Sequence, residues 1–332
     1  MQNHRKEKHH MDSILTQLSQ IGIVPVIQLE RAEDAVPLAK ALMAGGLPCA
    51  EITFRTAAGE EAIRKISQEV PEMLVGAGTV LTTEQAERAQ QAGAKFIVSP
   101  GLNPKVVAYC QQHNLPITPG CANPSDIEAA LELGLEAVKF FPAEQAGGIR
   151  YIKAISAPYG KIRFMPTGGI NEKNLNDYLS FDRVFACGGS WMVKPELIKA
   201  GAFDEITRLC RQAVRTMLGF SLVHVGINGT DSNQARNIAQ QFSLLFGLEV
   251  REEEKSVFAG SLIEVMKQPL RGAKGHIAIG THHLRRAAAH LERMGISFDP
   301  RSKAEVEQGL SHALYLKEEV GGFALHLISN KD

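Results

Sequence analysis

The feature that most constrains the fold is a strand–helix unit that recurs every ~20–30 residues from Ile23 onward. Each unit begins with a short apolar segment and a Gly, Pro or Thr turn. It continues with a segment whose apolar residues recur at three- and four-residue steps. This alternation is typical of parallel strands joined by helical crossovers. The expected strands are 23–29, 49–55, 73–80, 95–101, 115–120, 137–144, 163–170 and 184–191.

Eight parallel strands, each followed by a helix, make up a (β/α)8 TIM barrel, whose active site lies at the C-terminal ends of the strands. An open doubly wound sheet is the alternative, and it predicts a GxGxxG turn after the first strand. No such turn follows IVPVIQL at 23–29. The expected fold class is therefore α/β, with a TIM barrel over residues 11–219 and a smaller α+β domain over 220–332.

Composition excludes several kinds of partner. The 332 residues suffice for about two domains. The formal net charge is zero, with acids and bases interspersed, which argues against nucleic-acid binding through bulk electrostatics. No apolar run approaches the ~18 residues of a membrane span, so no membrane partner is expected. The five cysteines form no CxxC pair and indicate reduced thiols in a cytoplasmic protein. Residues 1–10, MQNHRKEKHH, are basic without an apolar signal core, and we expect a disordered leader there.

Polar side chains occur inside or at the ends of the apolar strands. Glu51, Thr53 and Arg55 alternate along the second strand and therefore point to one face. Lys139 lies within the apolar sixth strand, where a buried ammonium needs a partner or a function. We expect these residues to converge at one end of the barrel, although for Thr53 an incidental polar residue stays an open alternative. Three more are expected to join them from the third, seventh and eighth strands: Thr79, Thr167 and Ser190.

The environment of Lys139 suggests covalent chemistry. Its apolar neighbours Val138, Phe140 and Phe141 favour the neutral amine, which can attack a ketone and form a Schiff base. The resulting iminium draws electrons from an adjacent carbon–carbon bond, so that the bond can break. Glu51 is the candidate proton shuttle, and Arg55 offers a bidentate fork to a substrate carboxylate.

Two glycine turns end the last two strands of the expected barrel. They are Thr167-Gly168-Gly169-Ile170 and Gly188-Gly189-Ser190. Small residues let backbone N–H groups approach an anion, and a phosphate site after strands seven and eight is frequent in this fold. The pair of turns therefore predicts a phosphate site.

Residues 11 to about 215 resemble the 2-keto-3-deoxy-6-phosphogluconate (KDPG) aldolase / 4-hydroxy-2-oxoglutarate (KHG) aldolase family. The matching stretches are IVPVIQL, EITFRT, VGAGTVLT, FIVSPG, PITPG, VKFFPAE, PTGGI and GGSW, in the order of the family. The resemblance implies the Schiff-base lysine Lys139 and the general acid/base Glu51. It also implies a carboxylate site of Arg55, Thr79 and Thr167, pocket walls of Pro100 and Phe141, and a phosphate site of Gly168, Gly169 and Ser190.

The resemblance further implies a metal-free homotrimer that binds pyruvate and a phosphorylated sugar acid. The expected reaction cleaves KDPG into pyruvate and glyceraldehyde 3-phosphate, and 4-hydroxy-2-oxoglutarate into pyruvate and glyoxylate. A phosphogalactonate-type aldolase is one alternative. A phosphate-binding isomerase or epimerase barrel is another, and it would not need Lys139. The turn Cys121–Pro124 departs from many relatives, and this departure could alter aldehyde specificity.

Residues 220–332 divide into two similar halves. SLVHVGING opens the first half and GHIAIGT the second; each leads into a helical segment and ends in strands. Internal duplication of this kind is a strong indicator of fold. The segment resembles the vicinal-oxygen-chelate superfamily, which includes glyoxalase I. That resemblance implies paired βαβββ modules that form a cupped sheet.

The same resemblance places one metal ligand on each opening and closing strand: His224, Glu264, His276 and His326. Strand alternation sets them opposite most of the bulky apolar side chains, on the concave face. His326 departs from the usual glutamate, and three imidazoles favour Zn, Ni, Co, Mn or Fe over Mg. A degenerate module that keeps the fold without metal, acting as a non-catalytic binding domain, is the alternative.

Overall fold

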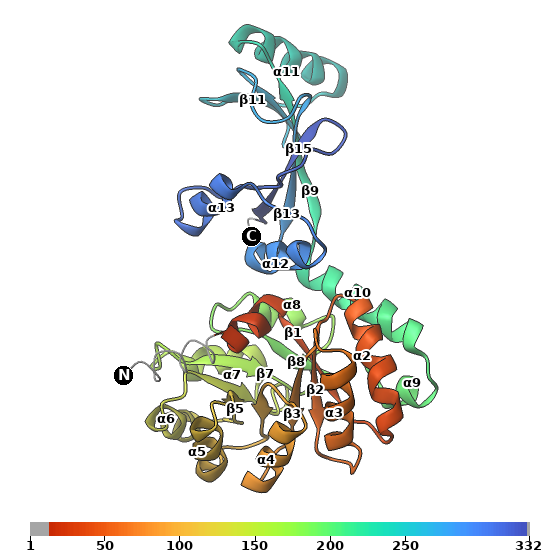
Figure 1. The fold of residues 1–332 in the computed structure, drawn as a ribbon. Coiled ribbons are helices and arrows are strands. Elements are labelled where there is room, and N and C mark those ends of the chain that lie inside the picture. The colour runs from red at the N-terminus through yellow and green to blue at the C-terminus, as the bar shows by residue number, and fades with distance from the viewer. Residues whose placement is uncertain (1–12, 331–332) are drawn as a thin grey trace. The chain divides into compact units, whose positions relative to one another are not determined.

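The computed structural model describes residues 13–330, so the expected disordered leader at 1–10 lies outside the described residues. The chain forms two compact units that divide between Met217 and Leu218, beside the expected boundary at 219 (Figure 1). Each unit has its own sheet and helices. Within residues 13–330, no helix is both long and apolar enough to cross a bilayer.

All eight expected strands of the first unit are present, and each is shorter than predicted. Pro and Gly after the apolar segments end the strands early; the fourth strand, for example, stops at Val98 before Pro100. The strands are β1 (Ile23–Ile27), β2 (Cys49–Thr53), β3 (Leu74–Gly78), β4 (Ile97–Val98), β5 (Ile117–Thr118), β6 (Ala137–Phe140), β7 (Arg163–Pro166) and β8 (Cys187–Gly189).

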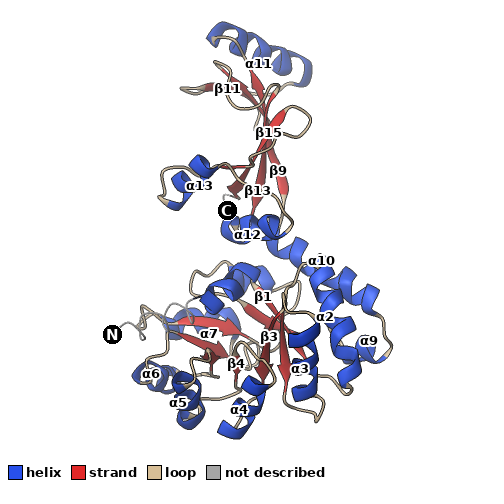
Figure 2. Cartoon of the chain, in the orientation of Figure 1, coloured by secondary structure: helices blue, strands red, loops and turns tan. Residues whose placement is uncertain are grey.

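These strands form a closed ring. Six of them lie in the order β5-β4-β3-β2-β1-β8, and β6 and β7 form a two-stranded sheet; all are parallel. Isolated bridges join the two sheets on either side: Gly120 to Lys139 on one side, and Phe164 to Val184 and Thr167 to Gly188 on the other. The expected TIM barrel is thus confirmed, with the strands inside a layer of helices (Figure 2).

The crossover helices begin at recognisable caps. Thr82, Asn103 and Asn123 each accept a hydrogen bond from a backbone N–H of the first turn, and proline follows both asparagines. Residues 13–21 are also helical. The bounds are η1 (Ala32–Asp34), α2 (Ala35–Ala44), α3 (Gly59–Glu69), α4 (Thr83–Gln91), α5 (Pro104–Gln112), α6 (Pro124–Glu132), α7 (Gly148–Ser156), α8 (Leu175–Leu179), α9 (Pro195–Lys199) and α10 (Phe203–Leu218).

The second unit is a seven-stranded sheet in the order β10-β11-β12-β9-β13-β15-β14. Its opening strands β9 and β13 pair antiparallel at the centre, and each pairs in parallel with the closing strand of its own half, β12 or β15. The bounds are β9 (Ser221–Asn228), α11 (Ser232–Phe246), β10 (Val250–Glu252), β11 (Ser256–Ala259), β12 (Ile263–Met266), β13 (Gly275–Thr281), α12 (Leu284–Arg293), α13 (Pro300–Glu307), β14 (Leu314–Tyr315) and β15 (Phe323–Ser329).

The first half is a βαβββ module, but the expectation of a second one is wrong in detail. After α12 the chain makes a single bridge, Phe298 to Leu316, and then enters the extra helix α13. Asp299 caps that helix by accepting from the Ser302 N–H at 2.8 Å, and Pro300 occupies its first turn. This start signal interrupts the strand that the pattern predicted.

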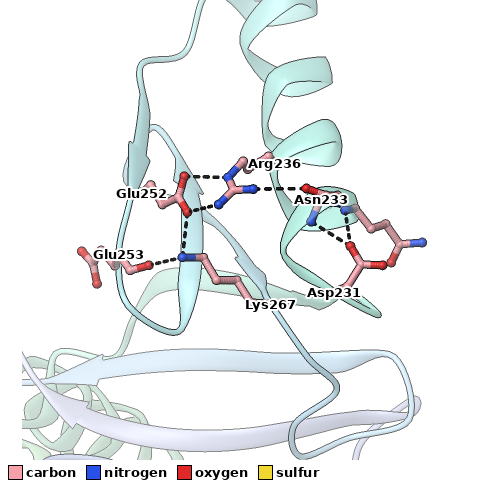
Figure 3. A network of polar contacts seen from close by, with 7 residues as sticks. Asp231, Asn233, Arg236, Glu252, Glu253 and Lys267 are labelled. Atoms are coloured by element: carbon pink, nitrogen blue, oxygen red, sulfur yellow. Dashed lines mark hydrogen bonds and ion pairs between the residues drawn. The ribbon is translucent and has the colours of Figure 1, made fainter.

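A polar network fastens α11 to the edge of the sheet (Figure 3). Arg236 donates to both carboxylate oxygens of Glu252, at 2.8 and 2.9 Å, and Lys267 pairs with the same carboxylate at 2.8 Å. On its inner side α11 packs Ala235 and Ala239 against buried residues of the strands. The helix is therefore held by an apolar face and an ionic rim.

Candidate functional site

Lys139 and Glu51 meet inside the barrel. Lys139 is 5% exposed and Glu51 is fully buried, and Lys139 Nζ lies 3.4 Å from Glu51 Oε1. The amine is also 5.2 Å from the centre of the Phe141 ring. Phe140 points the other way and its ring lies against that of Tyr151 on α7. Strand alternation therefore placed the amine beside the aromatic ring and the carboxylate, as the sequence predicted.

The backbone of β3 makes room for this pair. Gly78 lies opposite Thr53 in the next strand, and a Cβ at position 78 would overlap the Glu51 carboxylate. Glu51 Oε1 contacts the amine, while Oε2 is buried without a hydrogen-bond partner among the described residues. A buried carboxylate with one uncommitted oxygen is suited to exchanging protons with a reacting molecule.

Glycines shape the backbone at the end of β7 and in the turn after it. Thr167 is buried, and Gly188 on β8 leaves space for its hydroxyl, because a Cβ there would overlap it. Gly168 and Gly169 have φ of +100° and +82°, values that favour glycine. Gly189 is buried and Ser190 is exposed just after β8. The turn backbone is thus free of side chains of its own.

Three other predicted positions have different outcomes. Thr53 donates its hydroxyl to the Ile27 carbonyl at 2.9 Å, so it ties β2 to β1 and has a structural explanation. Arg55 lies two residues beyond β2 and is exposed, and no ion pair or hydrogen bond within the described chain joins it to Lys139 or Glu51. Thr79 follows β3 with a φ of +58°, rare for a residue with a side chain.

A cavity of about 340 Å³ opens next to Phe141, at the ends of β4 and β5. Pro100 and Phe141, the predicted pocket walls, both line it. Asn123 caps α6 from the unusual turn and also donates to Asp126 at 3.1 Å, which holds Asp126 at the cavity edge. Sequence reasoning missed the rest of the lining because loops after two different strands and the helices α5 and α6 supply it: Gly101, Leu102, Pro104, Gly120, Ala122, Asp126 and Ala129.

The family model described as KDPG and KHG aldolase matches residues 14–209. The chain belongs to the KDPG and KHG aldolase family. The matched residues include Lys139 and Glu51, and the match ends before the second unit begins.

Similar sequences and solved structures support the assignment to the KDPG and KHG aldolase family. The 2-dehydro-3-deoxy-phosphogluconate aldolase of Treponema pallidum is 53% identical over 205 residues, which are 62% of this chain and 98% of that protein. A crystal structure of KDPG aldolase from Legionella pneumophila, with pyruvate captured as a covalent carbinolamine, is 40% identical with a TM-score of 0.58. It covers 60% of this chain and 97% of its own. The KDPG aldolase of Zymomonas mobilis with 3-phosphoglycerate is 39% identical, with a TM-score of 0.56 and coverage of 61% and 94%.

The second unit of this aldolase-family chain has a site of its own. His224 Nε2 lies 3.1 Å from His276 Nε2, and Glu264 Oε2 lies 3.2 and 3.1 Å from these two nitrogens. One metal ion with bonds of ~2.1 Å holds its ligand atoms on the order of 3 Å apart. Three of the four predicted ligands therefore come together with the spacing of a metal site.

Strand register explains the cluster. Glu264, Gly226 and His276 face one another across β12, β9 and β13, and a Cβ at Gly226 would overlap the His276 ring. His224 lies in the neighbouring row, opposite Ala278, which in turn faces His326. Small residues thus separate the large ones, and the imidazoles turn toward a common point.

His326 stands slightly apart from the other three. Its ring centre is 5.3 Å from that of His276 and 5.7 Å from that of His224, and its nitrogens fall outside the close group. Burial, reinforced by the two neighbouring imidazoles, lowers the pKa of His326 to about 3, and burial also lowers the pKa of His224. Neutral imidazole is the form that binds metal.

Proposed function

We propose that the N-terminal unit is a Schiff-base aldolase that cleaves KDPG into pyruvate and glyceraldehyde 3-phosphate. The observation that carries this proposal is the buried Lys139 amine 3.4 Å from the Glu51 carboxylate, in a chain of the KDPG and KHG aldolase family. The relatives with covalently captured pyruvate and with a bound three-carbon phosphate support it. The phosphate-binding isomerase alternative gives Lys139 no role.

The two residues divide the chemistry between them. The neutral amine of Lys139 adds to the C2 ketone, and loss of water from the carbinolamine gives the iminium. Glu51 takes the proton of the C4 hydroxyl as the C3–C4 bond breaks, and the electron pair of that bond moves toward the iminium. The aldehyde leaves, and an enamine remains. Glu51 then returns a proton to C3, and water releases pyruvate from Lys139.

The remaining predicted residues would hold the substrate. In this proposal Arg55, Thr79 and Thr167 bind the carboxylate, and the Pro100 and Phe141 walls exclude water from the reacting carbons. Backbone at the two glycine turns takes the phosphate, as in other anion sites built from uncovered N–H groups. That phosphate site comprises Gly168, Gly169, Gly188, Gly189 and Ser190.

Borohydride trapping with pyruvate tests the nucleophile. The intact protein should acquire one covalent adduct, which peptide mass spectrometry locates on Lys139. The adduct should be absent from Lys139→Ala. It should be unchanged in Lys95→Ala, because Lys95 is exposed just before β4. An adduct that persists in Lys139→Ala, or cleavage activity that does, would refute the assignment. Rates with KDPG, its galactonate epimer and 4-hydroxy-2-oxoglutarate then rank the substrates.

We also propose that the C-terminal unit binds one divalent metal ion through His224, Glu264 and His276, with His326 as a fourth ligand. The donor set of three imidazoles and one carboxylate suits Zn, Ni, Co, Mn or Fe. The space left over Gly226 supports this proposal, since it lets His276 reach the other two ligands. A metal held there would polarise an oxygen of a bound molecule.

Elemental analysis after dialysis against each metal tests this second proposal. One ion per chain is expected, lost in His224→Ala and retained in His312→Ala, whose histidine is exposed. Metal-free protein under all conditions, with an unaffected aldolase rate, would instead favour a non-catalytic binding or assembly module.

A homotrimer in the cytoplasm completes the proposal. The family resemblance is the basis for the trimer, and the five buried cysteines, which form no disulfide, support a reducing compartment. Light scattering of the purified chain measures the mass of the oligomer, and a mass near that of a monomer would contradict the trimer.

A further inference from the structure

Two arginines stacked on aromatic rings flank the candidate metal centre. The Arg251 guanidinium lies 4.9 Å from the centre of the Phe258 ring, and that of Arg271 lies 4.6 Å from the centre of the Tyr315 ring. Phe258 in turn meets His224 edge-on at 6.1 Å, and Tyr315 lies 4.6 Å from His326. Each cation is thus connected to the cluster through a single ring.

Strand register puts these groups on the face that carries the ligands. Phe258 faces Glu264 across β11 and β12, and Arg251 faces Phe258 across β10 and β11. On the other side Tyr315 faces His326 across β14 and β15. This face of the sheet therefore carries a cation, an aromatic ring, the histidines, a second aromatic ring and a second cation, in that order.

The two arginines differ in how much of the guanidinium is already used. Arg251 has a 62% exposed side chain and contacts Glu253 through both Nε and Nη2. Arg271 is 39% exposed and pairs with Asp299 through Nη1 at 3.0 Å. Among the described residues, that single contact leaves the other donors of Arg271 for a ligand. Arg271 is the better prepared anion receptor.

The extra helix α13 fixes this receptor. Asp299 caps α13 with one carboxylate oxygen and accepts from Arg271 with the other. Its backbone N–H donates to the Tyr315 carbonyl at 2.9 Å, and Ser302 Oγ accepts from the Tyr315 N–H at 3.1 Å. The start of this extra helix, which the βαβββ pattern lacks, thus joins Asp299, Tyr315 and Arg271 into one hydrogen-bonded group beside His326.

We propose that this face binds a multi-carbon hydroxy- or oxo-acid, with its carboxylate on Arg271 and oxygens at its other end on the metal. The inference rests on the proposed metal centre. A guanidinium fork matches a carboxylate. Because the Tyr315 ring lies between Arg271 and the histidines, the carboxylate and the metal-binding oxygens must be several carbons apart. An acid of sugar length meets that requirement.

Gluconate and sorbitol test the proposal, because these six-carbon chains differ in the carboxylate and neither is a ketone that Lys139 could capture. The full chain, loaded with Co(II), is titrated with each while the visible absorption of the cobalt is recorded. Gluconate should change the spectrum at concentrations at least tenfold below those of sorbitol. Arg271→Gln should weaken gluconate on the order of tenfold or more, because a charge-assisted pair is lost.

Three controls make the outcomes distinct. Cobalt and sorbitol affinities should not change in Arg271→Gln, and Arg251→Gln should bind gluconate as the native chain does. Arg271→Lys keeps a cation opposite Asp299 but loses the fork, and it should also weaken gluconate while keeping cobalt. Absence of cobalt uptake by the native chain overturns the metal centre and this inference with it. Cobalt uptake with equal response to both probes, or gluconate binding unchanged in both Arg271 variants, overturns the carboxylate assignment alone.

Discussion

Two glycines determine whether reactive side chains have room. Glu51 occupies the space that a side chain at Gly78 would fill, and the His276 ring occupies the space above Gly226. In both cases the glycine lies on one strand and the reactive residue on its neighbour. A missing methyl group thus decides the position of a carboxylate in one unit and of an imidazole in the other.

Gly78→Ala should reduce aldolase turnover about hundredfold, since displacing Glu51 removes the proton transfer that a general acid/base contributes. The barrel should still form, and slow borohydride trapping on Lys139 should persist. Steady-state kinetics and thermal unfolding measure the two effects. Gly160→Ala is the matched control, because a Cβ there meets nothing within 4 Å. Native turnover in Gly78→Ala would show that the carboxylate position is unimportant.

Strand alternation within one element could be predicted from the sequence, but pairing between elements could not. Alternation sufficed to put Lys139 beside Phe141, and to set His224 in β9 and His326 in β15 each opposite most of the bulky apolar side chains of its own strand. The row that joins Tyr315 to His326 depends on antiparallel register, which the sequence does not encode locally. The helix start at Asp299-Pro300 carries a cap signal that the prediction of a second βαβββ module, made from the duplication pattern alone, did not take into account.

The ionic network that joins α11 to the edge of the sheet makes the stability of the second unit depend on pH. Hydrogen bonds from Arg236 and Lys267 lower the pKa of Glu252 from 4.5 to about 2. Because the folded-state pKa is the lower one, the stabilisation is complete above about pH 5 and is lost as the pH falls toward 2. Glu252→Gln should therefore lose less stability between pH 6 and pH 3 than the native chain.

Thermal unfolding at low and high salt measures this difference, which should shrink at high salt because the network is exposed. Glu254→Gln replaces a nearby exposed carboxylate and serves as the control. Identical acid sensitivity in Glu252→Gln and the native chain would contradict the role of the network.

The whole molecule holds a proposed aldolase pair and a candidate metal site in two separate units. The aldolase pair lies within the first unit and the candidate metal ligands within the second. The aldolase pair could be identified from motifs that occur in the order of the family. The candidate metal site rests on a duplication pattern and on distances that only the folded structure gives.

Hydrogen exchange should register metal binding in one unit alone. At a metal concentration ~100 times Kd, amides of β9, β12, β13 and β15 that exchange through opening of the site should slow about hundredfold. Amides of β1 to β8 should not change, and a chelator should leave the aldolase rate as it was. A chelator-sensitive aldolase rate would show that the two sites are coupled.

The seam of the barrel has a consequence for when the enzyme becomes reactive. Three isolated bridges join β6 and β7 to the other strands. One runs from Gly120 to Lys139, and the other two run from Phe164 to Val184 and from Thr167 to Gly188. A chain whose ring is open along this seam holds Lys139 apart from Glu51, so the amine lacks the carboxylate proposed to move the protons of the reaction. The contacts that complete the ring are therefore the same contacts that assemble the proposed catalytic pair, so we expect aldolase activity to begin only when the ring closes.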